Sequence, residues 1–395
     1  MRNEFSGLQH EVKCFDKELI EELRRVYASR VQELLKLLRR PPSRLYARVN
    51  TLKTTRANLI RELEEEGVEA YPDEHLSDAI YFRVEGPYEF ECSGEKAIVV
   101  DEHTATSIML GADLYRPGIV KMPKFAKGET LRVVTRRGEL VACVEAAVSS
   151  DQARAIVKGL IGVNIGSPYK APKIAQTRAY AKGLLYPQSA PSIVTSHVLS
   201  PKEGMLVLDM NASPGGKTGH IVQLTRGRAL VVAVDRSEKK VAILQKTLER
   251  LGLNIGVLAI PGDSRYAHID LNIENKADRV LIDPPCSNLG VRPLLGCGRK
   301  FSEVLNLANY QRQFLRSGYY SLKKGGLLVY STCTLTLKEN EENILYAVEE
   351  VGLHPVELPE TPPYAEKVSF KGITAYRFSP FTHDMPGYFI AVLTK

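Results

Sequence analysis

The chain has 395 residues, 44% of them hydrophobic and 25% charged, which is typical of a globular protein with two or three domains. A net charge of +7 suits a polyanionic partner, although many basic proteins bind none, and no run approaches the ~20 apolar residues of a membrane span. The 6 cysteines form no CxxC pair, which argues against a disulfide framework or a zinc site and predicts a protein without metal. The first residues lack the apolar core of a signal peptide, so the protein is expected to be cytoplasmic.

The first expected unit, over residues 1–92, is a small α+β module. Apolar residues recur in it at three- and four-residue steps among charges, as they do on amphipathic helices. The expected elements are one or two helices over residues 16–40, a strand over 45–52 and a helix over 55–67. Arg48 and Asn50 on the strand are candidates for contact with RNA, and a purely structural strand is the alternative.

A compact β-barrel is expected next, because short strand-like runs alternate with glycines. The runs cover residues 97–100, 118–120, 130–135 and 140–146, with one helix at 103–111. Residues 121–137 carry six cations against the single acid Glu129, a pattern that could follow a phosphate backbone or form a solvated loop. The candidate RNA-binding residues of this stretch are Lys121, Lys124, Lys127 and Arg136.

Several short segments of this unit together resemble a PUA domain, a small RNA-binding barrel. The segments are residues 99–102, 111–115, 117–119, 127–129 and 137–139. The resemblance covers residues 93–170 and implies that this unit binds RNA.

The third unit, with a linker at its start, spans residues 171–395. Strand-like runs alternate with helical segments, which predicts right-handed crossovers and a mostly parallel sheet with helices on both faces. The runs cover residues 205–209, 230–235, 257–260, 279–283 and 327–331, followed by a pair at 373–378 and 388–393 that suggests an antiparallel edge hairpin.

A glycine-containing loop follows the first of these strands and leads into a helix. Gly215 and Gly216 allow the backbone to approach a ligand closely, and the helix start supplies free N–H donors. The loop is close to a Walker A loop, but Asn211 occupies the place of its first glycine. A site for S-adenosylmethionine is the better interpretation, because Asp235 ends the next strand, where it can bind ribose, and Asp263 follows the third, where it can bind the adenine amine.

Two strands end at cysteines, Cys286 after Asp283-Pro-Pro and Cys333 after the fifth strand. Carbon 5 of a pyrimidine attacks a methyl sulfonium only when a thiolate has first added to carbon 6. The reaction also needs an acid near N3 and a base that removes the proton from carbon 5. The three candidates for these roles are Cys333 as the nucleophile, Asp283 as the acid and Cys286 as the base. The two strand ends that carry them are expected to lie side by side.

Two other functions are less consistent with these residues. Enzymes that methylate exocyclic amines carry an aromatic residue after Asp-Pro-Pro, where this chain has Cys286, and their mechanism does not need Cys333. A non-catalytic RNA-binding protein would be expected to lose Cys333, Asp283 or the glycines, and all are present.

The whole chain resembles the Nop/Sun family of RNA cytosine-5 methyltransferases. The resemblance is carried by residues 48–53, Gly183, 187–189, 209–218, 283–287, Gly290, Arg292, Gln311, 328–334, 339–343 and 383–391. It implies a Rossmann-like α/β methyltransferase domain, Cys333 as the nucleophile, Cys286 in product release and Asp283 on the cytosine. It also implies Lys217 beside the cytosine and Lys240 beside the cofactor.

The expected cofactor is S-adenosylmethionine. Its expected site comprises Asp209, Asn211, Ala212, Ser213, Pro214, Gly215, Gly216, Lys217, Asp235, Lys240, Asp263 and Asp283. The family usually has cysteine in place of Asn211 and alanine in place of Ser213, which is expected to alter loop packing at most. An inserted PUA domain narrows the resemblance to the subgroup that methylates the tRNA acceptor stem, with the barrel on the CCA end of tRNA and the enzyme a monomer.

Overall fold

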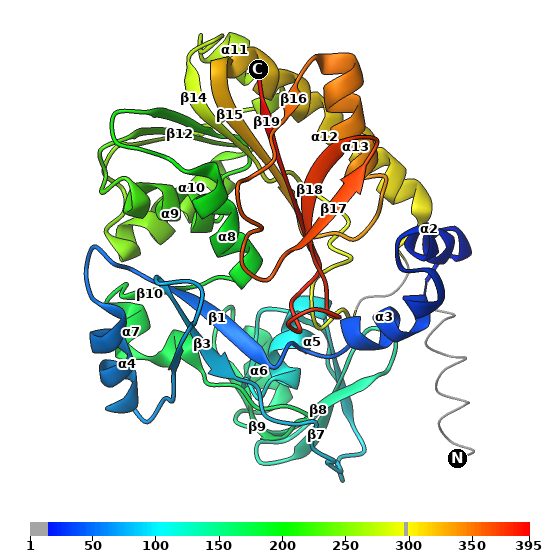
Figure 1. The fold of residues 1–395 in the computed structure, drawn as a ribbon. Helices are drawn as coiled ribbons and strands as arrows, with labels where there is room; N and C mark the ends of the chain where they lie inside the picture. The colour runs from blue at the N-terminus through cyan, green and yellow to red at the C-terminus, as the bar shows by residue number, and fades with distance from the viewer. Residues whose placement is uncertain (1–14, 296–298) are drawn as a thin grey trace.

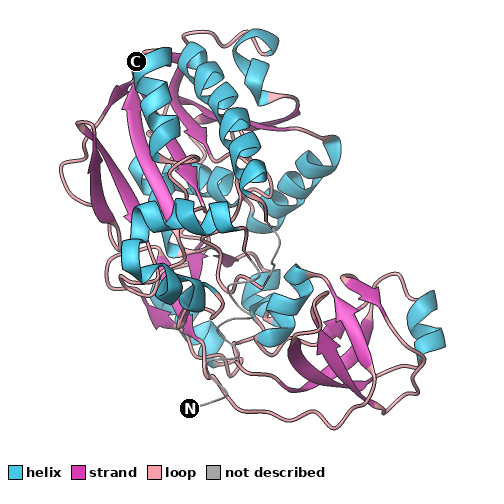
Figure 2. Ribbon diagram, turned by 90° about the vertical axis from the view of Figure 1, so that its right-hand side faces the viewer, coloured by secondary structure: helices cyan, strands magenta, loops and turns pink. Residues whose placement is uncertain are grey.

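The computed structural model describes residues 15–295 and 299–395, and these fold around three β-sheets (Figure 1). A four-stranded sheet belongs to the N-terminal module, a six-stranded sheet forms a barrel, and a nine-stranded sheet organises the C-terminal half. Figure 2 shows the barrel standing apart from the large sheet and its helices. Within the described ranges, none of the helices combines the length and the apolar character needed to span a bilayer.

The N-terminal module begins with two amphipathic helices and continues into an antiparallel sheet of order β10-β1-β3-β2. Its elements are α2 (Lys17–Tyr27), η1 (Ala28–Arg30), α3 (Val31–Leu38), β1 (Arg44–Val49), α4 (Arg56–Glu64), β2 (Tyr71–Pro72) and β3 (Ala79–Arg83). The side chain of Thr55 caps α4 by accepting a hydrogen bond from the backbone N–H of Asn58, so the expected helix begins one residue later. Periodicity and capping therefore predicted α2, α3, β1 and α4 correctly.

The fourth strand of this sheet comes from beyond the barrel. After η2 (Ile174–Gln176) and α7 (Arg178–Ala181), strand β10 (Leu185–Pro187) pairs antiparallel with β1. Residues 171–187 were expected to belong with the methyltransferase unit, and here the structure differs. The barrel is inserted within the N-terminal module, and β10 is too short for its sheet to be recognised from the sequence.

The barrel sheet has the order β5-β9-β8-β7-β4-β6, with β4 and β7 parallel and the other pairs antiparallel. Its elements are β4 (Ala97–Val100), α5 (Glu102–Met109), β5 (Leu114–Tyr115), β6 (Ile119–Lys121), β7 (Thr130–Val134), β8 (Leu140–Ala146), α6 (Ser150–Ala155) and β9 (Leu160–Gly166). The four expected strands and the expected helix are present. β5, α6 and β9 were not foreseen.

A disulfide joins Cys92 to Cys143 across the barrel, with Cα atoms 5.5 Å apart. This corrects two expectations, that the cysteines form no disulfide and that these two are simply small buried side chains. The pairing is invisible in the sequence because 51 residues separate the two positions and only the fold brings them together. Cys14 and Cys297, for which the same buried role was expected, lie outside the described residues.

The large sheet has the order β13-β12-β11-β14-β15-β19-β18-β17, with β16 also paired to β19. Its strands are β11 (Leu206–Asp209), β12 (Leu230–Asp235), β13 (Val257–Pro261), β14 (Ala277–Ile282), β15 (Leu322–Thr332), β16 (His354–Pro355), β17 (Glu366–Phe370), β18 (Ile373–Phe378) and β19 (Tyr388–Thr394). The first five are parallel, as expected. The last pair is antiparallel, but β19 lies between β15 and β18, so the sheet edge is β17 rather than the expected hairpin.

Helices cover both faces of this sheet, as Figure 1 shows. One apolar core packs the sheet against α8 (Ala190–Leu199), α9 (Gly216–Leu224) and α10 (Glu238–Leu251). The other packs it against α11 (Ala267–Asp270), α12 (Phe301–Ser321) and α13 (Glu341–Tyr346), with η3 (Ser264–Tyr266) and η4 (Ala347–Val351) beside them. This double cover confirms the predicted Rossmann-like α/β architecture.

The loop after β14 is held by all three units. Leu289 is buried against the helices of the N-terminal module, and Leu295 is buried in the core of the barrel. Between them, Arg292 donates a hydrogen bond to the carbonyl of Leu37 at 3.0 Å and pairs with Asp384 at 2.6 Å. The position of this loop therefore depends on the packing of the whole molecule.

A buried carboxylate joins the N-terminal module to the large sheet. Asp78, just before β3, has one oxygen 3.0 Å from Nε2 of His197 and the other 2.7 Å from Nε2 of His220. Burial acts to raise the pKa of Asp78, but these two hydrogen bonds outweigh it and hold the pKa well below its ordinary value. Burial, together with the nearby Arg48, lowers the pKa of His220 to about 3.

This cluster predicts a loss of stability in mild acid. Below pH 6.5 the unfolded chain protonates His220, whereas the folded protein does so only near pH 3. The unfolded state then binds more protons, so the free energy of unfolding falls by about 1.4 kcal/mol per pH unit from this residue. Urea unfolding of the wild type and His220→Gln between pH 7 and 4.5 measures it, and the variant should show the shallower slope.

The exposed His103→Gln provides a matched control and should keep the wild-type slope. The titration of Asp78 does not interfere, because a lowered carboxyl pKa acts only at more acidic pH. Equal slopes in the wild type and His220→Gln would contradict a neutral, buried His220.

Candidate active site

Two neighbouring strand ends bring the two cysteines together. β14 and β15 pair in parallel, with Ile282 opposite Tyr330. Their carboxyl ends place Sγ of Cys286 3.3 Å from Sγ of Cys333, and Cys286 is the more deeply buried of the two. The expectation that these two strand ends lie side by side is confirmed.

Asp283, at the end of β14, is fully engaged by neighbouring side chains. Its Oδ2 accepts a hydrogen bond from Nζ of Lys217 at 2.6 Å, and its Oδ1 accepts from Ser331 at 2.9 Å and from Tyr388 at 3.2 Å. Burial acts to lower the pKa of Lys217, but the attraction of Asp283 outweighs it and raises the pKa. The carboxylate therefore has a fixed orientation beside the cysteines.

A second carboxylate lies behind the cysteine loops. Glu339 is completely buried, and its oxygens accept hydrogen bonds from hydroxyl, amide and backbone donors. The donors are Ser287 N–H at 2.8 Å, Ser287 Oγ at 2.5 Å, Thr334 at 3.3 Å, Thr336 at 3.0 Å and Gln311 at 2.9 Å. Because Ser287 follows Cys286 and Thr334 follows Cys333, Glu339 ties the two loops to each other.

The surroundings of the two thiols differ. The hydrogen bond with Cys333, together with burial, raises the pKa of Cys286 well above its ordinary value. Both thiols donate to Oδ1 of Asn288, Cys333 from 2.9 Å and Cys286 from 3.3 Å. Cys286 is thus the thiol that keeps its proton, and the more exposed Cys333 is the better placed nucleophile.

A cavity of about 190 Å³ lies beside Asp283, at the carboxyl ends of the strands. Eight of the predicted cofactor residues line it: Asp209, Asn211, Ala212, Ser213, Pro214, Gly216, Lys217 and Asp283. Tyr186, Pro187, Gln188, Ser189 and Ser192 complete the lining. The cavity therefore has walls from the glycine loop, from the end of β14 and from β10 with the segment that follows it.

The glycines of the loop have structural reasons. Gly215 is the N-cap of α9 with a φ of 105°, a conformation that favours glycine. A Cβ on Gly216 would lie 2.7 Å from the ring of Tyr186, so a larger residue would displace the cavity wall.

Burial raises the pKa of Asp209 to about 6, although Thr218 donates a hydrogen bond to it.

Asp235, Lys240 and Asp263 are not among the residues that line the cavity. Asp235 accepts a hydrogen bond from the backbone N–H of Ser213 at 3.0 Å and pairs with Lys240 at 3.2 Å. Asp263 is bound by Arg265, whose hydrogen bond lowers the pKa of this carboxyl. A direct contact of Asp235, Lys240 or Asp263 with the cofactor stays a prediction.

The cavity suits a polar, nucleoside-like ligand. Among the described residues, Oδ1 of Asn211 and Oε1 of Gln188 are buried without a hydrogen-bond partner. Both side chains line the cavity, where a ligand with donor groups would satisfy them. The residues present therefore fit S-adenosylmethionine.

The expectation that Arg48 and Asn50 contact RNA is corrected. Both side chains are 1% exposed. Arg48 donates to the carbonyl of Gly216 at 2.9 Å, and Asn50 donates to the carbonyls of Gly183 and Leu251 at 2.9 and 2.7 Å. Arg48 thus attaches β1 to the first residue of α9, and Asn50 attaches it to the last residue of α10. A sequence pattern does not distinguish these roles from ligand contact.

The basic stretch of the barrel is at the surface, with Lys121, Lys124, Lys127 and Arg136 all exposed. Its acid, Glu129, pairs with Lys96 at 2.7 Å, and the hydrogen bond with Lys96 lowers the pKa of Glu129. Nothing described contradicts RNA contact by the four cations, which stays a prediction.

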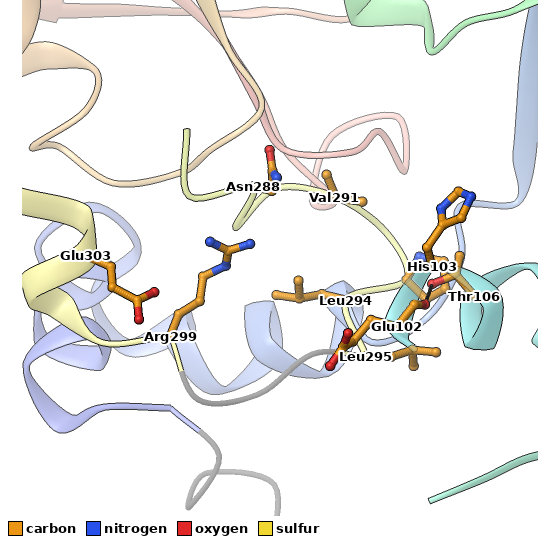
Figure 3. A pocket seen from close by; sticks show the side chains of 10 residues that line it. Glu102, His103, Thr106, Asn288, Val291, Leu294, Leu295, Arg299 and Glu303 are labelled. Atoms are coloured by element: carbon orange, nitrogen blue, oxygen red, sulfur yellow. Dashed lines mark hydrogen bonds between the residues drawn. The ribbon is translucent and has the colours of Figure 1, made fainter. Parts of the chain in front are cut away.

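A second cavity, of about 490 Å³, lies between the barrel and the cysteine loop (Figure 3). Helix α5 contributes one wall, and the loop after β14 contributes Asn288 and Val291 to the other. The residues around it are Glu102, His103, Thr106, Asn288, Val291, Pro293, Leu294, Leu295, Arg299 and Glu303. The cavity joins the barrel surface to the side chain that contacts both thiols.

Asp78, His197 and His220 have ligating atoms within 4.8 Å of one another, close enough to hold a metal ion. Each oxygen of Asp78 already bonds one histidine, and the Arg48 guanidinium that lowers the pKa of His220 opposes a further cation. The cluster is explained as a link between modules, and the absence of a metal stays a prediction.

Several site residues were not foreseen in their roles. Tyr388 lies within an apolar run that predicts only a strand, and Glu339 lies in a helix-like acidic segment. Gln188 matched the family pattern without an assigned role. Asn288 had one usable signal, since asparagine tolerates the left-handed conformation of a tight loop.

Comparison with known families matches three models to the chain. Residues 196–394 match the "16S rRNA methyltransferase RsmB/F" model, residues 96–165 match the PUA domain, and residues 16–89 match the ferredoxin-like domain of RsmF/B-like methyltransferases. The first model covers the large sheet with both cysteines.

Two curated proteins and one solved structure are similar over most of the chain. The tRNA (cytosine(72)-C(5))-methyltransferase of Pyrococcus horikoshii is 36% identical, over 97% of this chain and 98% of its own. The human tRNA (cytosine(72)-C(5))-methyltransferase NSUN6 is 31% identical, over 84% of this chain and 78% of its own. The crystal structure of NSun6 from Pyrococcus horikoshii with SFG, an analogue of S-adenosylmethionine, superposes with a TM-score of 0.86 at 35% identity, covering 97% of this chain and 98% of that one.

The paired cysteines, the cavity beside them, the three matched models and the length of the similarity agree. The chain belongs to the RsmB/F family of S-adenosylmethionine-dependent RNA cytosine-5 methyltransferases, with a ferredoxin-like N-terminal module and a PUA domain.

Proposed function

We propose that this protein methylates carbon 5 of a cytosine in the acceptor stem of tRNA, with Cys333 as the nucleophile. The observation that carries the proposal is the placement of two thiols 3.3 Å apart at adjacent strand ends, next to Asp283 and the cofactor cavity. S-adenosylmethionine, when bound there, supplies the methyl group. Asn211, Ser213, Gly216 and Gln188 would hold it, since they line the cavity.

The two thiols divide the work at the cytosine ring. Cys333, as a thiolate, adds to carbon 6 and moves electron density to carbon 5, which is otherwise too weak a nucleophile. Carbon 5 then carries both its proton and the new methyl group, and the proton must leave before the sulfur can. Cys286 takes this proton after losing its own to solvent, and its raised pKa then makes its thiolate a strong base.

Asp283 and Lys217 orient the base. The carboxylate is fixed by Lys217, Ser331 and Tyr388, so it can bind the exocyclic amine or the N3 edge of cytosine in one geometry. Lys217 lies in the first turn of α9, directly after the glycine loop, where it lines the cofactor cavity and bonds Asp283. Its positive charge would thus lie beside both the cytosine and the cofactor. A cation here stabilises negative charge that develops on the ring after the attack of Cys333.

The tRNA substrate is supported by the similarity to tRNA (cytosine(72)-C(5))-methyltransferases along almost the entire chain. It is also supported by the barrel, because the second cavity connects helix α5 of the barrel with Asn288 beside the cysteines. RNA held by the barrel would thus have its neighbouring nucleotides at the nucleophile. We infer that the barrel binds the acceptor end and selects the cytosine, and that the enzyme acts as a monomer.

The exocyclic-amine reaction is the less supported alternative. It has no use for a thiol at carbon 6. Cys333 is the more exposed thiol of the pair, and it comes two residues after Ser331, which donates a hydrogen bond to the carboxylate that would hold the base. Position 286 also lacks the aromatic ring on which such enzymes stack the base.

Replacing each cysteine tests the chemistry directly. With labelled S-adenosylmethionine and a tRNA transcript, Cys333→Ala is expected to give neither methylated RNA nor a covalent complex on a denaturing gel. Cys286→Ala is expected to accumulate the covalent protein–RNA complex, because the base that permits release is missing. Methylation of RNA by Cys333→Ala at the wild-type rate would refute the assignment of the nucleophile.

Transcripts test the acceptor stem. A minihelix of acceptor stem with its CCA end is expected to be methylated at a rate within about tenfold of full tRNA, since an acceptor-end reader retains its main contacts. A tRNA whose acceptor stem is replaced by an unrelated helix should not be methylated. Equal methylation of this tRNA would place the target elsewhere in the RNA.

Glu339→Gln tests the tie between the two cysteine loops. An amide replaces one acceptor oxygen by a donor that faces other donors, so the free energy of unfolding should fall by about 1–3 kcal/mol and methyl transfer should slow. Urea unfolding and single-turnover methylation measure both effects. The exposed Glu350→Gln is the matched control, and its free energy of unfolding and rate of methyl transfer should equal those of the wild type. If Glu339→Gln also equals the wild type in these two measurements, the loops are held without this carboxylate.

A further inference from the structure

Asn288 is the side chain that contacts both thiols. It lies two residues beyond Cys286 with a φ of 56°, in the left-handed region. Its Oδ1 is 2.9 Å from Sγ of Cys333 and 3.3 Å from Sγ of Cys286. Figure 3 shows it on the loop at the edge of the second cavity, so the side chain that contacts both sulfur atoms also lines the space that borders the barrel.

Among the described residues, no other polar side chain bonds the sulfur of Cys333 in this way. Within the described ranges, the hydrogen bonds of its sulfur go to Cys286 and Asn288. The nearby Lys217 is engaged with Asp283 at 2.6 Å. The other charged or titratable groups that face this region are Glu339 behind the loops and Glu102, His103, Arg299 and Glu303 around the second cavity.

A thiolate needs donors, whereas a thiol needs an acceptor, and a carboxamide offers both. Rotation about its Cβ–Cγ bond exchanges the oxygen and the NH₂ group in nearly the same space. With the oxygen toward the sulfur atoms, the amide accepts from both thiols. With the NH₂ group toward Cys333, it donates to a thiolate, while the Cys286 thiol donates from the other side at 3.3 Å.

We propose that Asn288 is a positioning residue that holds the sulfur of Cys333 and stabilises its thiolate by turning its amide from acceptor to donor. The Cys333 proton leaves to solvent in this step, and no covalent bond between heavy atoms changes. The inference rests on the proposed function for its purpose, since a stabilised thiolate is what addition to carbon 6 requires. The contacts that carry it are those of the free protein.

Alkylation of Cys333 by iodoacetamide tests the inference without RNA or cofactor. The rate is followed from pH 6 to 10 by mass spectrometry of the peptide that contains Cys333, in the wild type, Asn288→Gly, Asn288→Ala and Asn288→Asp. Glycine suits the positive φ, and alanine keeps Cβ and removes only the amide. We expect the midpoint of the pH profile to rise by about one unit in Asn288→Gly and Asn288→Ala, which is about tenfold slower alkylation at pH 7, with rates that converge at high pH.

Asn288→Asp should shift the midpoint further upward, because a carboxylate cannot donate and repels a thiolate. The rate of methyl transfer to tRNA should follow the same pH shifts. Coincident profiles in the wild type and Asn288→Gly, or an Asn288→Gly rate that is lower by one factor at every pH, would overturn the inference. A shifted alkylation profile without any methylation of tRNA by the wild type would instead keep the role of Asn288 and refute the proposed substrate.

Discussion

The parallel pairing of β14 with β15 is the constraint on which the site depends. It sets Ile282 opposite Tyr330, so that the residues just beyond, Asp283 on one strand and Ser331 to Cys333 on the other, emerge at the same edge of the sheet. Without further contacts, the two loops that follow these strands would adopt many conformations, because ordering a loop costs conformational entropy. The buried Glu339 removes that freedom by bonding the residue that follows each cysteine, and the thiols are left 3.3 Å apart.

The N-terminal module and the barrel also contact the loops that form the site. The N-terminal helices and the barrel each bury one leucine of the loop after β14, Leu289 and Leu295. Arg48 of the N-terminal sheet reaches the carbonyl of Gly216 in the cofactor loop. The cofactor loop and the loop that follows Cys286 are therefore held in place by the other two units as well as by the large sheet.

The fold and the chemistry were largely predictable from the sequence, and the contacts between distant segments were not. Alternating apolar runs showed the strands of the large sheet, and the residues at their ends showed Asp283, Cys286 and Cys333. Periodicity does not show which strands pair or which cysteines bond. The sequence analysis therefore missed β10, the disulfide between Cys92 and Cys143 and the edge position of β17. Arg48 was misjudged because an arginine on a strand looks the same in sequence whether it faces RNA or a carbonyl in the core.

The insertion of the barrel has a topological consequence. β3 and β10 both run antiparallel to β1 on its two sides, so they are parallel to each other. Parallel strands cannot be joined by a tight turn and require a crossover, and here an entire barrel with α7 provides it. The barrel is consequently tethered at two points of one small sheet, on strands that lie two spacings or about 10 Å apart, and it resists the swinging that a single linker would allow. If the barrel binds the acceptor end of tRNA as proposed, this double attachment sets the distance from the bound RNA to the two sulfur atoms.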